Sequence, residues 1–87
     1  METIFRKESE GEILAVFLDF VHGSRLDCYA HVGQHGTCSI DYVINDTTPA
    51  TPEERDPLYH ELCGIGYSDL DVLEDVPEWL VKGERRP

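Results

Sequence analysis

The sequence predicts an α+β domain in which a small antiparallel sheet of roughly four strands carries one main helix on one face. Two observations predict this fold. Runs of alternating apolar residues fill the first half of the chain, and a segment with a strong helix start and helical apolar spacing follows them. At 87 residues the chain has room for one domain. We expect this domain to span residues 1–82, with residues 83–87 as a loose basic tail.

Three strands are predicted in the first half of the chain, at residues 3–7, 12–20 and 26–32. The second has apolar residues on both of its faces, which is typical of a central strand. After the third strand, Gly33 and Gly36 bracket two polar residues and predict a turn.

The main helix is predicted to start at Pro52. Thr51 would cap it, and Glu54 would complete a capping box. Its apolar face would contain Leu58, Leu62 and Ile65. Pro57 conflicts with a helix interior, where proline costs about 3 kcal/mol. The helix therefore either bends there or begins at Pro57, with Asp56 as its cap.

Shorter elements complete the prediction. Residues 39–45 alternate like a strand, but Ser39 suits the N-cap of a short helix, which we favour. Residues 68–74 form a last strand, and residues 76–81 add a helical turn that lays Trp79 on the body. One helix cannot cover both faces of a sheet, so the second face would be exposed, covered by the tail or paired in a homodimer.

The chain is strongly acidic, with 18 Asp and Glu against 7 Lys and Arg and a net charge of −11. Between residues 8 and 81 only Arg25 and Arg55 oppose the acids. Such a field repels nucleic acid and membrane surfaces and attracts cationic molecules. We therefore expect a basic protein partner and no direct contact with nucleic acid or a membrane.

The acids allow two interpretations: solubility alone, or a continuous face that engages a cationic groove by mimicking phosphates. The residues of such a face would be Glu53, Glu54, Asp56, Glu61, Asp69, Asp71, Glu74 and Asp75. Trp79 would be an apolar anchor beside it, or simply a core-packing aromatic residue. The face predicts an interaction protein. It would be an inhibitor from a phage or mobile element that blocks a basic, nucleic-acid-binding host protein such as a defence enzyme.

An alternative function is a ligand- or metal-binding domain centred on the turn between His31 and Cys38. His31, His35 and Cys38 are zinc-ligand types at short spacing, and Gln34 lies among them. Against zinc, structural sites usually draw ligands from two separate elements. A glycine-hinged turn whose histidines bond local backbone is the other interpretation. No other cofactor is expected.

Catalysis has weaker support. Cys38 with His35, or Cys63 with His60 one helical turn away, would form a thiol–imidazole pair. A thiol nucleophile also needs an orienting group and an oxyanion site, and no motif indicates a reaction, so a binding role is favoured over an enzyme. The 3 cysteines do not form a disulfide framework, and no secretion signal or membrane span is recognised. We expect a cytoplasmic protein.

Part of the sequence resembles a family of small uncharacterised bacterial and mobile-element proteins. The stretches that carry the resemblance are His31-Val-Gly-Gln-His-Gly36, Thr48-Pro-Ala-Thr-Pro-Glu-Glu54, Glu61-Leu62 and Ile65-Gly-Tyr67. The resemblance implies a compact fold over residues 3–74 and a shared ligand or partner site at residues 31–36. It implies no reaction, because the family has no assigned activity. At Arg55-Asp56-Pro57 the chain departs from the continuous helix that the resemblance implies.

Overall fold

The computed structural model describes residues 1–31 and 33–83. In chain order its elements are β1 (Glu2–Lys7), β2 (Ile13–His22), β3 (Arg25–Ala30), β4 (Gln34–Ser39), α1 (Ile40–Asn45), β5 (Thr48–Pro49), α2 (Pro52–Gly64), β6 (Asp71–Leu73) and α3 (Glu78–Val81). The predicted α+β class is confirmed. The last residue of the predicted third strand, Val32, and residues 84–87 of the predicted tail lie outside the described part of the chain.

The strands form one sheet in the order β4-β3-β2-β1-β5. Neighbours along this order are antiparallel, whereas β6 pairs parallel to β1. β5 and β6 share the edge of β1 that β2 leaves open, because β5 pairs with Arg6 and Lys7 and β6 with residues 2–4. No strand was predicted where β5 lies, and the strand predicted at residues 68–74 is longer than β6.

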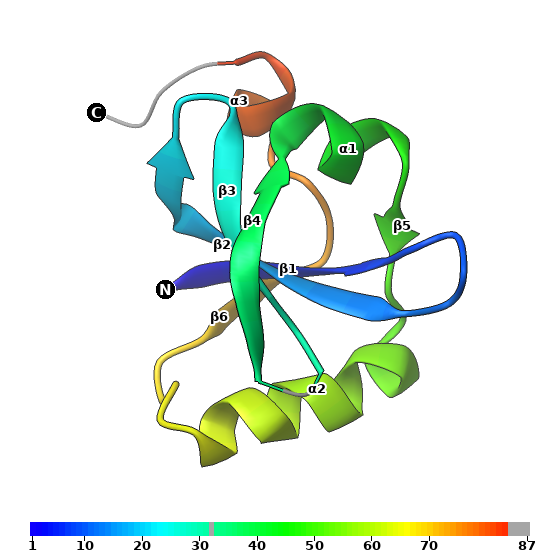
Figure 1. Cartoon of the computed structure of the whole chain (residues 1–87), viewed down its shortest axis with the longest axis vertical. Helices are drawn as coiled ribbons and strands as arrows, with labels where there is room; N and C mark the ends of the chain where they lie inside the picture. Colours follow the sequence, from blue (N-terminus) through cyan, green and yellow to red (C-terminus); the bar gives the residue numbers. More distant parts are fainter. Residues whose placement is uncertain (32, 84–87) are drawn as a thin grey trace.

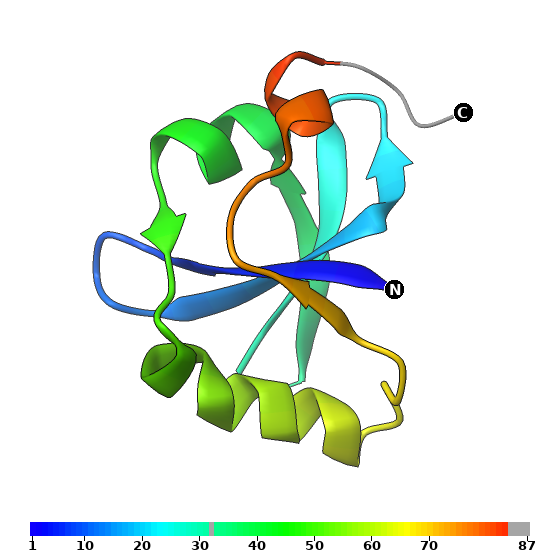
Figure 2. The same cartoon turned by 180° about the vertical axis from the view of Figure 1, so that it is seen from behind.

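Helices cover both faces of the sheet, α2 on one side and α1 with α3 on the other (Figures 1 and 2). The α2-side core consists of Phe5, Ala15, Phe17, Tyr29, Ala50, Leu58 and Leu62. The α1/α3-side core consists of Ile4, Leu14, Val16, Leu18, Leu26, Cys28, Cys38, Val43 and Leu80. β2 supplies alternate residues to both cores, as predicted for a central strand. The second face, for which the sequence left three alternatives open, is covered by α1 and α3.

The predicted turn from Gly33 to Gly36 is wrong, because most of this stretch belongs to strand β4. Ala30 pairs with Gln34, so the chain reverses between these two residues. Gly33 has a φ of 64°, which favours glycine. Gly36 lies within the strand, opposite Cys28. Glycine and small polar residues are poor strand formers, and here pairing with β3 outweighs propensity.

The helices α1 and α2 begin at the predicted caps. The Ser39 hydroxyl accepts a hydrogen bond from the backbone N–H of Tyr42 at 3.0 Å. Thr51 and Glu54 form the capping box, with reciprocal bonds of 2.9 and 3.2 Å. α2 continues through Pro57, so the alternative start at Pro57 is wrong. The capping box and the burial of the apolar face offset the hydrogen bond that this proline cannot donate.

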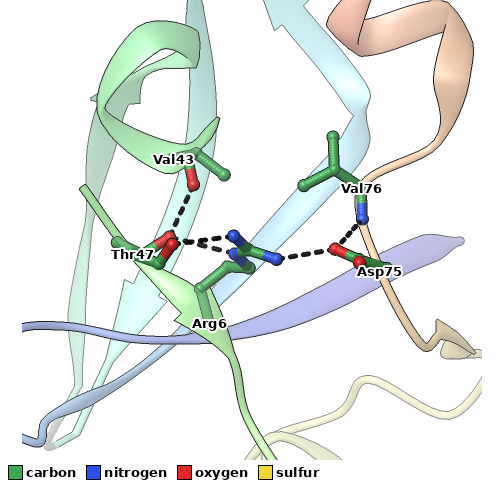
Figure 3. Close-up of polar contacts among 5 residues, drawn as sticks. All are labelled: Arg6, Val43, Thr47, Asp75 and Val76. Carbon is green, nitrogen blue, oxygen red and sulfur yellow. Dashed lines mark hydrogen bonds and ion pairs between the residues drawn. The ribbon is translucent and has the colours of Figure 1, made fainter. Parts of the chain in front are cut away.

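Arg6 is the centre of a buried polar network (Figure 3). Its side chain is 5% exposed. Nε donates to the Thr47 hydroxyl, Nη2 to the Thr47 carbonyl and Nη1 to Asp75, each at 2.9 Å. The Thr47 hydroxyl donates to the Val43 carbonyl at 2.6 Å, and the Val76 N–H donates to Asp75 at 2.7 Å. One guanidinium therefore joins β1 to the segment before β5 and to the segment after β6.

Replacing Arg6 with methionine would keep much of the aliphatic volume and remove every donor. We expect Arg6→Met to lower the free energy of unfolding by about 1–3 kcal/mol, because the buried oxygens of Thr47 lose their partner. Asp75→Asn is the control, since its side chain is 67% exposed, and it should cost less than about 1 kcal/mol. Urea unfolding measures both. Equal losses would mean that the surface ion pair, and not the buried donors, stabilises the network.

Candidate functional site

The end of the β3–β4 hairpin meets the C-terminal half of α2 (Figure 1). The carboxylate of Glu61 on α2 accepts hydrogen bonds from the Tyr29 hydroxyl and from Nδ1 of His31. Nδ1 is the donor because an ionised carboxylate only accepts. The Tyr29 hydroxyl in turn accepts from the backbone N–H of Gly33 at 2.9 Å. These bonds, here called the Glu61 cluster, attach the hairpin to the helix.

Hydrogen bonding fixes the protonation states of this cluster. The Tyr29 hydroxyl, and next the His31 ring, hold the pKa of Glu61 below its ordinary range. The same carboxylate raises the pKa of Tyr29, because an ionised phenol would face a second anion. At neutral pH the cluster therefore contains a charged carboxylate and a protonated phenol. The His31 side chain is 72% exposed, which leaves Nε2 accessible to a ligand.

A groove of about 380 Å³ lies beside the cluster, between α2, the start of β2 and the hairpin. Its lining residues are Glu12, Ile13, His31, Glu54, Pro57, Leu58 and Glu61. Lys7 Nζ binds Glu54 at 2.6 Å and holds its pKa low. Glu12 is exposed at the groove. Apolar side chains and carboxylates together suit a ligand with an aliphatic stem and a cationic end.

The acids predicted to form one face are distributed along α2 and the segment that follows it. The exposed ones include Glu53, Asp56, Asp69 and Asp71. Glu54 is engaged by Lys7. Arg55, one of the few cations, binds both carboxylate oxygens of Glu74 at 3.2 and 3.3 Å. The acids are thus accessible, but cations lie among them.

Trp79 does not lie beside the acids of α2. It packs half-buried against the α1/α3-side core, on the face of the sheet opposite α2. This position matches the core-packing interpretation of Trp79. The other polar candidate, Gln34, is exposed at the start of β4.

The structure separates the residues predicted to ligate zinc. His35 lies opposite Tyr29 in the ladder, on the α2 side, with the two ring centroids 4.7 Å apart. Cys38 lies opposite Leu26 and is buried in the α1/α3-side core. His31 bonds the helix instead. Among the residues described, no three His, Cys, Asp or Glu side chains come together as a metal site would require.

Neither predicted thiol–imidazole pair is assembled. Cys38 and His35 point to opposite faces of β4. Cys63 is exposed on α2, where its thiol neighbours Tyr59 and raises the pKa of that hydroxyl. His60 instead places Nδ1 3.0 Å from the Asp56 carbonyl oxygen.

Four groove residues, Glu12, Ile13, Pro57 and Leu58, and the phenol of Tyr29 were not predicted as site residues. A signal for Tyr29 was present, since a tyrosine on a buried strand needs a partner for its hydroxyl. The groove residues carry no comparable signal, because they come together only when β2 and α2 pack.

No family model, curated protein or solved structure matches this chain. The resemblance noted in the sequence therefore stays a prediction. Within residues 1–31 and 33–83, no helix combines the length and apolar character needed to cross a membrane.

The lowered pKa of Glu61 predicts a pH-dependent stability. A carboxylate with a depressed folded pKa stabilises the fold above its ordinary pKa, and this stabilisation is lost as the pH falls through the folded value. We expect Glu61→Gln to melt at a lower temperature than the parent at neutral pH. The gap should narrow between about pH 5 and about pH 3.

Thermal melts followed by circular dichroism measure this gap. Glu10→Gln is the matched control, because Glu10 is exposed outside the cluster, and its melting temperature should stay close to that of the parent. A gap for Glu61→Gln that is constant over the pH range would contradict the assigned charge state.

Proposed function

We propose that this protein is a small acidic interaction domain that binds a basic, nucleic-acid-binding protein and competes there with nucleic acid. The proposal rests on how the charges are used. Every Lys and Arg in the described part of the chain is bonded within the protein. The acids outnumber these cations and are mostly exposed.

The cations are used to hold the fold together. Their partners are Thr47 and Asp75 for Arg6, Glu54 for Lys7, Thr37 for Arg25, Glu74 for Arg55 and Glu78 for Lys82. Because the carboxylates outnumber these cations and leave the chain with a net charge of −11, the field around it is negative. Such a field attracts a basic surface over a distance and repels a phosphate backbone.

The groove supplies a contact for one basic side chain. The aliphatic stem of a lysine or arginine would pack on Ile13 and Leu58, and its charged end would reach Glu12. The pKa values of Glu54 and Glu61 are lowered, so both carboxylates stay charged at the groove wall. An inhibitor that mimics nucleic-acid charge would use this contact within a wider acidic field.

A capped octapeptide of alternating glycine and lysine tests the contact. We expect it to shift the amide NMR signals of Ile13, His31 and Leu58 in the labelled protein. Binding should weaken between about 0.1 M and about 1 M salt, because the Debye length falls from about 10 Å to about 3 Å.

Two variants with the same charge change separate the groove from the general field. Glu12→Gln should weaken peptide binding about two- to fivefold, the range of an exposed ion pair. Glu10→Gln lies outside the groove lining and should weaken it less. Peptide binding that does not change with salt concentration would overturn the proposed function. Equal effects of the two variants would mean that the groove is not the contact for the basic side chain.

A further inference from the structure

β4 forms one edge of the sheet, and among the described strands only β3 pairs with it. The Ile40 N–H donates to the Ser24 carbonyl at 2.9 Å. With the β3–β4 register, this bond shows which β4 residues hydrogen-bond to β3 and which direct their backbone groups away from it. In an antiparallel pair, every second residue directs its backbone N–H and C=O away from the partner strand. On β4 these outward residues include His35 and Thr37.

This edge has only part of the usual protection against pairing. Proteins protect edge strands with charged side chains, proline, bulges or very short strands. β4 is six residues long, reads Gln-His-Gly-Thr-Cys-Ser and pairs with β3 without a register shift. Arg25 covers part of it, since Nη2 donates to the Thr37 carbonyl at 3.1 Å. The second lone pair of that carbonyl, the Thr37 N–H and both backbone groups of His35 stay directed outward.

Exposed apolar side chains flank β4 on the α2 side. Phe20 is 43% exposed and lines a hollow with His35 and Gly36. Ile65 is 52% exposed and lines a second hollow with His35. Tyr67 borders both hollows. An added strand would therefore gain side-chain contacts as well as backbone hydrogen bonds, which is how strand addition achieves affinity.

We propose that β4 pairs antiparallel with β4 of a second copy of this chain, across a two-fold axis near Gly36. Outward residues then meet outward residues, with His35 opposite Thr37 of the partner subunit. Gly36 would face its own copy at the axis, where the absence of a side chain allows close approach. Such an interface is self-complementary, as a two-fold dimer requires.

The charge of β4 favours pairing of this edge with a second copy of the chain over pairing with a basic protein. β4 has no carboxylate that a basic protein would recognise. Its own side chains include no Asp, Glu, Lys or Arg on a chain with a net charge of −11, and the Arg25 guanidinium bonded to Thr37 is a cation, so two copies approach there with less repulsion than at the acidic surfaces. This dimer is independent of the proposed basic partner, and salt distinguishes them. Screening weakens attraction to a basic partner and strengthens association between like-charged copies.

Sedimentation velocity and amide hydrogen exchange test the dimer on the intact chain. From about 10 µM to about 1 mM protein, we expect the dimer fraction to rise with concentration and to be larger at about 1 M salt than at about 0.1 M. Exchange at the amides of His35 and Thr37 should slow at least about tenfold as the dimer forms.

Gly36→Glu and Gly36→Ala form a matched pair of variants. A Cβ at Gly36 meets no atom within 4 Å, so both should fold, which a thermal melt checks. Gly36→Glu places like charges at the axis and should weaken the dimer at least about tenfold, whereas Gly36→Ala should retain it.

Three results would overturn the proposal. The first is a protein that stays monomeric at every concentration and salt. The second is a dimer that Gly36→Glu leaves unchanged, since it would use another surface. The third is protection of His35 and Thr37 only when a different protein is added, which would assign the edge to that protein.

Discussion

The layered arrangement of sheet and helices depends on the hydrogen bonds that the Arg6 guanidinium donates. β1 has β2 along one side, and among the described strands its other side is paired by β5 and β6 alone, which are two and three residues long. Strands this short contribute few ladder bonds. Arg6 supplements them by bonding Thr47 just before β5 and Asp75 just after β6. Because α1 precedes Thr47 and α3 follows Asp75, the same side chain holds in place the two helices that close the second face.

The features that could be predicted from the sequence are those that depend on residues close together in the chain. The caps at Ser39 and Thr51 are local hydrogen bonds, and the alternation along β2 is a local pattern, so both could be read directly. β4 could not, because pairing with β3 holds its glycine and polar residues in a strand. The Arg6 network was equally inaccessible, since Thr47 and Asp75 lie 41 and 69 positions away. A buried arginine among apolar residues indicates that partners exist but not which ones.

In the candidate site, too, single residues could be predicted from the sequence, whereas contacts between distant residues could not. His31 and Glu61 were both singled out, but for different roles, because 30 positions separate them and only the packing of hairpin on helix joins them. The zinc set depended on the predicted turn. A turn at residues 33–36 would allow His35 and Cys38 to converge, whereas a strand places residues an odd number apart on opposite faces. The wrong turn thus kept zinc binding open as an alternative for a segment in which the strand holds His35 and Cys38 apart.

The order of the strands along the chain has a consequence for how the protein folds as it is synthesised. β1 is synthesised before the other described strands, but it lies inside the finished sheet, and one of its partners, β6, ends at Leu73. The bond from Arg6 to Asp75 likewise cannot form until Asp75 has been synthesised. The nascent chain can form the antiparallel units of β1 to β4, while the second face is fully covered only when the last segment, which contains α3, has been made. Folding is therefore completed only after nearly all of the described chain has been made, because its most distant contacts close last.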